Sequence, residues 1–147
     1  MRVLITGSRT WDDYSIIFEA LKEYGSNHVL VSGNCPMGAD FLCEKAAEEL
    51  GWDVELFPAN WEKYGKRAGF LRNSEMVETS PDICLGFVHN KSKGAAMTVR
   101  LAKQAGVLTK EYSLTGFGFE KDLVIKIFNQ PNGIVLEKND NTESFLF

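Results

Sequence analysis

The sequence is poor in the residues that build metal centres and disulfide frameworks. Its three cysteines, Cys35, Cys43 and Cys84, show no CxxC spacing, and only two histidines accompany them. An odd number of cysteines without paired spacing is typical of reduced thiols inside a cell. We therefore expect no structural zinc, no other bound metal and no cofactor.

The sequence also has no long hydrophobic run, and its first residues do not show a signal-peptide pattern. No apolar stretch approaches the roughly 20 residues that span a bilayer. The first residues, Met1–Thr6, have the pattern of a strand rather than that of a basic and apolar signal peptide. We expect a cytoplasmic protein that does not bind membranes. Its 147 residues, 44% of them hydrophobic and 24% charged, suit one globular domain with its own core.

An overall positive charge is missing as well, because the chain carries a net charge of −4. Bulk attraction to nucleic acid is therefore not expected. The charge is unevenly distributed, since Trp61–Lys110 contains nine lysines and arginines against four acids. This local excess suits a phosphorylated ligand, although a solvated helix surface also accounts for most of these lysines.

Strand patterns alternate with helix patterns from the N-terminus to about Tyr112, and this alternation predicts an α/β fold. We expect a Rossmann-like, doubly wound parallel sheet of about five strands, with right-handed crossovers. The helical stretch after the third strand should break near Gly65 and Gly69. The expected strands are Arg2–Thr6, His28–Ser32, Asp53–Pro58, Ile83–Val88 and Val107–Tyr112, and the expected helices are Asp12–Tyr24, Gly38–Leu50, Asn60–Thr79 and Lys93–Gln104.

The character of the chain changes after Ser113. Two strand-like runs, Leu123–Phe128 and Ile134–Glu137, flank a turn pattern at Gln130–Gly133. We expect residues 1–112 to form the Rossmann-like domain and residues 113–147 to form a C-terminal β-hairpin extension that is not an independent domain. The apolar ending Phe145–Phe147 should dock on the body or on a partner subunit.

Two strand-to-loop junctions carry the strongest functional signal. Thr6-Gly7-Ser8-Arg9 and Val31-Ser32-Gly33-Asn34 each lead a short apolar run into glycine and a hydroxyl residue. Helix N-termini and bare backbone N–H groups converge at this edge of open α/β sheets, so ligands bind there. One glycine alone fits a tight turn equally well, but two at equivalent sheet positions favour a site for an anionic small molecule.

Other candidates belong to the same sheet edge. Asp40, in the helix that Gly38 opens, could accept a ribose hydroxyl or serve the helix dipole. Arg72 with Asn73 suits phosphate or base-edge recognition, whereas an ion pair between Arg72 and Glu75 is the plain alternative. The segment Gly94-Ala95 begins a further helix and offers backbone donors.

Several single residues leave two interpretations open. Arg9 could bind phosphate or form a salt bridge to Asp12 or Asp13. His89 ends the fourth predicted strand at the ligand edge, so a binding or catalytic role is possible for it. The aromatic residues Trp11, Trp61 and Tyr64 could stack on a base, although packing in the core or rim is the default.

In order and spacing these elements resemble the SLOG superfamily, and more narrowly its YspA/YpsA-related branch, over about Met1–Tyr112. The resemblance implies a Rossmann-like fold that binds nucleotides or nucleotide-derived ligands, often in homo-oligomers such as dimers or larger assemblies. Relatives include the LOG phosphoribohydrolases, the DNA-processing DprA proteins and sensors of nucleotide signals. The implied ligand-binding residues are Gly7, Ser8, Arg9, Ser32, Gly33, Gly38, Ala39, Asp40, Arg72, Asn73, Gly94 and Ala95.

One departure changes the functional expectation from turnover to binding. The phosphoribohydrolases share a PGGxGTxxE stretch, whereas the corresponding Lys91–Thr98 lacks the double glycine and the glutamate. Our first hypothesis is therefore a sensor or sequestering protein for a nucleotide-like small molecule. The first alternative is a nucleoside 5'-monophosphate N-glycosidase with Glu75 or Asp40 as catalytic residue. The second, single-stranded DNA binding as in DprA, is disfavoured by the charge.

Overall fold

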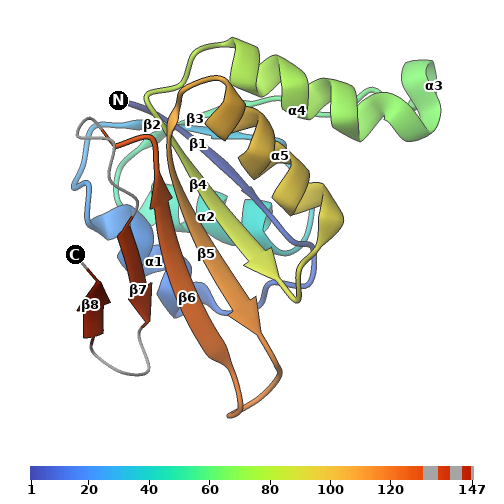
Figure 1. Cartoon of the computed structure of the whole chain (residues 1–147). Helices are drawn as coiled ribbons and strands as arrows, with labels where there is room; N and C mark the ends of the chain where they lie inside the picture. Colours follow the sequence, from blue (N-terminus) through green and yellow to red (C-terminus); the bar gives the residue numbers. More distant parts are fainter. Residues whose placement is uncertain (131–135, 140–143, 147) are drawn as a thin grey trace.

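Strands from the whole chain join in one mixed sheet. The computed structural model describes residues 1–130, 136–139 and 144–146. Within these residues the sheet has eight strands in the order β3-β2-β1-β4-β5-β6-β7-β8 (Figure 1). The first five neighbours pair in parallel, which confirms the predicted sheet, and their bounds are β1 (Arg2–Gly7), β2 (Val29–Ser32), β3 (Asp53–Leu56), β4 (Ile83–His89) and β5 (Leu108–Thr115).

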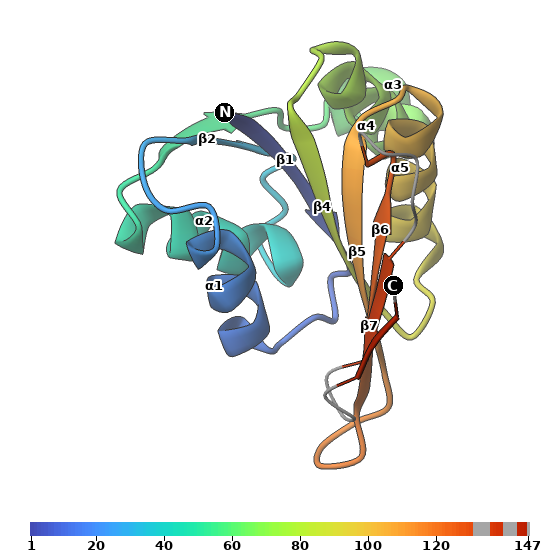
Figure 2. The same cartoon turned by 60° about the vertical axis from the view of Figure 1, so that its left-hand side comes forward.

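Helices cover both faces of the parallel part. Helices α1 (Tyr14–Lys22) and α2 (Ala39–Glu49) lie on one face, and α4 (Ala68–Glu78) and α5 (Lys93–Gln104) lie on the other (Figure 2). All seven residues of the central strand β4 are buried, as expected of a strand covered on both faces. The doubly wound prediction is confirmed.

Local signals explain most helix boundaries. The Asp13 side chain accepts the N–H of Ile16 and caps α1. The predicted break near Gly65 is confirmed, because α3 (Trp61–Tyr64) ends there and the 3₁₀ turn η1 (Gly65–Arg67) leads into α4. Gly69 itself lies in the first turn of α4, directly after this break. A Cβ at Gly69 would come 3.3 Å from the Trp61 ring, so this glycine gives room to a distant side chain.

The strand order creates a switch point beside β1. From β1 the chain adds β2 and β3 on one side, then returns to the other side of β1 with β4 and β5. The segments that follow β1 and β4 lead to helices on opposite faces, so a crevice opens between them. Open α/β sheets bind their ligands at this point.

The C-terminal region continues the same sheet. Strand β5 runs to Thr115, across the boundary predicted at 112/113, and pairs antiparallel with β6 (Asp122–Phe128). The antiparallel pairing of β6 with β7 (Leu136–Asn139) confirms the hairpin strands, while most of the predicted turn lies outside the described residues. Strand β8 (Ser144–Leu146), which we did not predict, pairs with β7. Phe147 also lies outside the described residues.

No helix in the described part of the chain combines the length and the apolar character that crossing a membrane requires. The expected cytoplasmic location and the expected homo-oligomer stay predictions.

Candidate ligand-binding site

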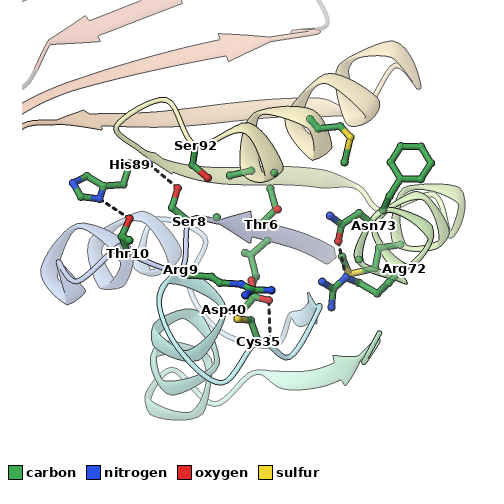
Figure 3. Close-up of a pocket in the computed structure, with 18 of the residues that line it drawn as sticks. Thr6, Ser8, Arg9, Thr10, Cys35, Asp40, Arg72, Asn73, His89 and Ser92 are labelled. Carbon is green, nitrogen blue, oxygen red and sulfur yellow. Dashed lines mark hydrogen bonds between the residues drawn. The ribbon is translucent and has the colours of Figure 1, made fainter. Parts of the chain in front are cut away.

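A cavity of about 580 Å³ lies at the carboxyl ends of β1 and β4, at the switch point. Side chains from the β1 end, α2, α4 and the β4 end converge on it (Figure 3). Nine of the twelve predicted ligand-binding residues line this cavity or the one beside it. Eight line this first cavity, namely Gly7, Ser8, Arg9, Asp40, Arg72, Asn73, Gly94 and Ala95, and Gly33 lines an adjoining cavity.

The first junction is bound tightly to its surroundings. A Cβ at Gly7 would lie 2.3 Å from the Cβ of Ala39 and 2.7 Å from the carbonyl oxygen of Phe87. The Ser8 N–H donates to that carbonyl at 2.9 Å, and the Ser8 Oγ accepts the N–H of His89 at 2.9 Å. Gly7 and Ser8 therefore hold the end of β1 against α2 and β4, and the Ser8 hydroxyl oxygen already accepts one hydrogen bond.

The start of α2 rests on the same junction. Gly38 has φ 75°, and a Cβ there would lie 2.5 Å from the carbonyl oxygen of Ser8. The Ala39 N–H donates to this oxygen at 3.1 Å. Ala39 is buried and, like Gly38, is not part of the lining of either cavity. These two predicted residues shape the site without facing a ligand.

The second junction is built differently. Ser32 is fully buried, donates to Glu44 at 2.7 Å and accepts the N–H of Asn34 at 3.1 Å, so it does not line the cavity. Gly33 instead lies against the Arg72 guanidinium, because a Cβ there would be 2.6 Å from Nη1. The Arg72 Nη1 donates to the Gly33 carbonyl. The two glycines thus face different elements.

Arg72 joins α4 to the second junction. Its Nε donates to the Asn73 side-chain oxygen at 2.6 Å, and Nη1 makes a longer contact of 3.4 Å with the Phe57 carbonyl. Nη2 has no hydrogen-bond partner within the described residues. Glu75 is exposed, lines neither cavity and makes no ion pair with Arg72 in the described chain. The geometry therefore gives no support to Glu75 as a catalytic residue.

Arg9 reaches the cavity from the opposite side (Figure 3). It is exposed and forms no ion pair among the residues the structure describes. The alternative partners Asp12 and Asp13 instead lie 3.8 and 3.9 Å from Lys121. The guanidinium of Arg9 is thus available to a ligand.

Asp40 is the buried acid of the site. It is 8% exposed, and its Oδ2 accepts the Cys35 N–H at 3.1 Å. Burial raises the pKa of Asp40 to about 6, against the lowering effects of the Cys35 N–H, Arg72 and Arg9. The carboxyl group can therefore accept a ligand hydroxyl when ionised, or donate a proton when neutral.

The first turn of α5 closes the cavity above β4. A Cβ at Gly94 would meet nothing within 4 Å, so the backbone there is open to the cavity. Ser92 precedes the helix without a side-chain capping bond, which leaves first-turn N–H groups without a side-chain acceptor. This end of the helix favours negative charge.

His89 supports the site. Its Nδ1 lies 2.8 Å from the Thr10 hydroxyl, and its Nε2 lies 3.2 Å from the Gly116 carbonyl. A carbonyl only accepts, so we assign the proton to Nε2, and Nδ1 accepts from Thr10. His89 thereby connects the β1 loop with the β5–β6 loop, whose Phe117 also lines the cavity.

Among the predicted aromatic residues, Trp11 belongs to the core and Tyr64 lines neither cavity. Trp61 lines both cavities. The predicted site residues did not include Cys35, which lines both cavities and donates its N–H to Asp40 at the start of α2. Within the described chain, no group of three or more histidines, cysteines and acids is placed to hold a metal ion.

A parallel sheet covered by helices on both faces, with a polar cavity at its switch point, defines a Rossmann-like α/β domain. The chain belongs to the YspA, cpYpsA-related SLOG family, whose model matches residues 1–64. It is similar to the Gene 61 protein of Mycobacterium phage D29, with 41% identity over 117 residues that cover 72% of this chain and 91% of that protein. No solved structure matches the chain significantly.

Proposed function

We propose that the protein binds a nucleotide or a nucleotide-derived, phosphorylated small molecule and acts as a sensor or sequestering protein. One observation carries this proposal: Arg9 and Arg72 present unused guanidinium donors to a cavity that the first turn of α5 also faces. Guanidinium groups and helix N-termini are the groups that recognise phosphate. A volume of about 580 Å³ is of the size that holds a small-molecule ligand.

The remaining polar groups suit the sugar of such a ligand. Asp40 and Asn73 line the same cavity as the arginines and provide a hydroxyl acceptor and an amide. Because Asp40 is buried, its ionised carboxylate is costly without hydrogen-bond donors, and a ligand hydroxyl would supply one.

The binding test is isothermal titration calorimetry with nucleoside 5'-monophosphates. Small molecules that co-purify with the protein are identified by mass spectrometry and titrated in the same way. Arg9→Ala should weaken binding at least tenfold without lowering the melting temperature, because Arg9 makes no hydrogen bond or ion pair within the described chain. The matched control is Arg100→Ala, at an exposed position of α5 outside both cavities. Unchanged affinity in Arg9→Ala would show that the anion lies elsewhere.

One observation favours an alternative, nucleoside monophosphate N-glycosidase activity. A carboxyl group whose pKa is raised to about 6 beside the cavity suits a general acid. Asp40 would give its proton to the base as the bond from C1' to the base breaks. Water would then add to C1' of the ribose and lose one proton to the Asp40 carboxylate, which restores the acid. Free base that accumulates over many turnovers in the wild type, but not in Asp40→Asn, would establish this alternative; binding without base release would exclude it.

A further inference from the structure

A second cavity of about 570 Å³ adjoins the first but has a different chemistry. The two share Arg9, Cys35, Trp61 and Arg72, so they meet along one line of residues. The first cavity is lined by many hydroxyl, amide and carboxyl groups. The residues particular to the second are mostly small or apolar, namely Gly33, Asn34, Pro36, Met37, Pro58 and Ala59.

Trp61 provides an aromatic surface at the line where the cavities meet. It begins the short helix α3, which the Asn60 side chain caps by accepting the Lys63 N–H at 3.0 Å. Its ring packs over Gly69, where a Cβ would come within 3.3 Å of it. Trp61 is nevertheless 50% exposed. An indole that is held from one side and open on the other suits stacking with a planar group.

Charge and shape indicate which part of a ligand belongs in each cavity. Arg9 and Arg72 line both cavities, so a phosphorylated group is favoured where the cavities meet and in the polar first cavity. The apolar second cavity then suits the uncharged part of the same molecule. In a nucleotide that part is the base, which has a flat π face and stacks on aromatic side chains whatever its sequence identity.

We propose that the second cavity is the nucleobase subsite and that Trp61 is its stacking residue. This inference rests on the proposed nucleotide binding and adds that one ligand spans both cavities. The ligand class is therefore a nucleotide, whose aromatic base occupies the second cavity; a sugar phosphate would occupy only the first.

The three tryptophans make a direct optical test possible. Trp11 and Trp52 are 1% and 5% exposed, so Trp61 dominates the fluorescence that acrylamide can quench. Nucleoside 5'-monophosphates should protect Trp61 from acrylamide and change its emission on binding. Ribose 5-phosphate should bind, as followed by calorimetry, and leave the acrylamide quenching unchanged.

Variants separate stacking from general damage. Trp61→Leu should weaken nucleoside monophosphate binding tenfold or more and leave ribose 5-phosphate binding unchanged, while Trp61→Phe should restore most of the nucleotide affinity. Ala59→Phe should weaken the nucleotide selectively by filling the second cavity. The control is Tyr64→Leu, which removes an exposed aromatic residue of the same helix that lines neither cavity.

The outcomes distinguish this inference from the proposed function. If neither ligand binds the wild type, the proposed nucleotide binding itself fails. If both bind and Trp61→Leu weakens both equally or neither, nucleotide binding stands and the base subsite is wrong. Selective loss of the nucleotide in Trp61→Leu and Ala59→Phe supports the subsite.

Discussion

The two strand-to-loop junctions are similar in sequence but differ in structure. At the end of β1, Gly7 faces helix α2 and Ser8 bonds to the backbone of β4. At the end of β2 the order is reversed: Ser32 bonds to Glu44 of α2, and Gly33 faces Arg72 of α4. The first junction joins the backbone of β1 to that of β4, whereas the second leaves room for the charged side chain of Arg72.

Strand register explains the difference. Leu4 of β1 pairs with Val31 of β2, so Gly7 lies three residues beyond its paired position and Gly33 only two. Successive side chains of a strand point to opposite faces, and the two glycines therefore face opposite sides of the sheet. Our expectation that they occupy equivalent sheet positions is wrong. A glycine at a strand end indicates a close approach, but the register decides what approaches.

The largest expected effect is on the first junction. Gly7→Ala should lower the free energy of unfolding by about 3 kcal/mol, because the new Cβ would overlap Ala39 and the Phe87 carbonyl, neither of which can move alone. Thermal unfolding should show a melting temperature lower by roughly 10 °C. The control is Gly94→Ala, where a Cβ meets nothing within 4 Å and stability should not fall. Equal stability of both variants would contradict the packing of α2 on β1.

The next largest effect on stability is expected at Asp40, which accepts the N–H of Cys35, the residue after the second junction. Folding raises the pKa of Asp40 from its ordinary 3.8 to about 6, because the carboxyl is buried. Between these pH values the folded state binds more protons at Asp40 than the unfolded state does. The contribution of Asp40 to the free energy of unfolding is therefore complete below pH 4 and is lost as pH rises through 6. Relative to the wild type, Asp40→Asn should gain about 2 kcal/mol of stability from pH 4 to pH 7.

Denaturant unfolding at several pH values measures this effect. Asn can still accept the Cys35 N–H, so the hydrogen bond is a small part of the difference. Glu48→Gln, at an exposed position of the same helix, is the control and should follow the wild type. Parallel pH profiles of unfolding free energy for Asp40→Asn and the wild type would show that burial does not raise the pKa of Asp40.

Much of the fold was predictable because its signals are local. The limits of α5 match the predicted helix, and Asp13, a residue type that favours the N-cap position, caps α1. The site was harder to predict, because it depends on contacts between distant segments. The position of Gly69 under the Trp61 ring has no local signal, and the burial of Ser32 against Glu44 depends on register. The second cavity joins two loops that the sequence separates widely.

The smallest effect on stability, and the most specific effect on binding, is expected at the second junction. In Gly33→Ala the new Cβ would lie 2.6 Å from Nη1 and 2.8 Å from Cζ of Arg72. These atoms end a flexible side chain, which can move away, so we expect a stability loss of about 1 kcal/mol or less. The displaced guanidinium should weaken nucleotide binding about tenfold, or about 1.4 kcal/mol.

A double-mutant cycle shows whether Gly33 acts through Arg72. If it does, Gly33→Ala should weaken binding in the wild type but have little further effect in Arg72→Ala, since the displaced group is then absent. Calorimetry measures binding and thermal unfolding measures stability in all four proteins. Two independent, additive losses would mean that Gly33 contacts the ligand itself. A stability loss as large as that of Gly7→Ala would mean that both junctions are structural, and the comparison between them would fail.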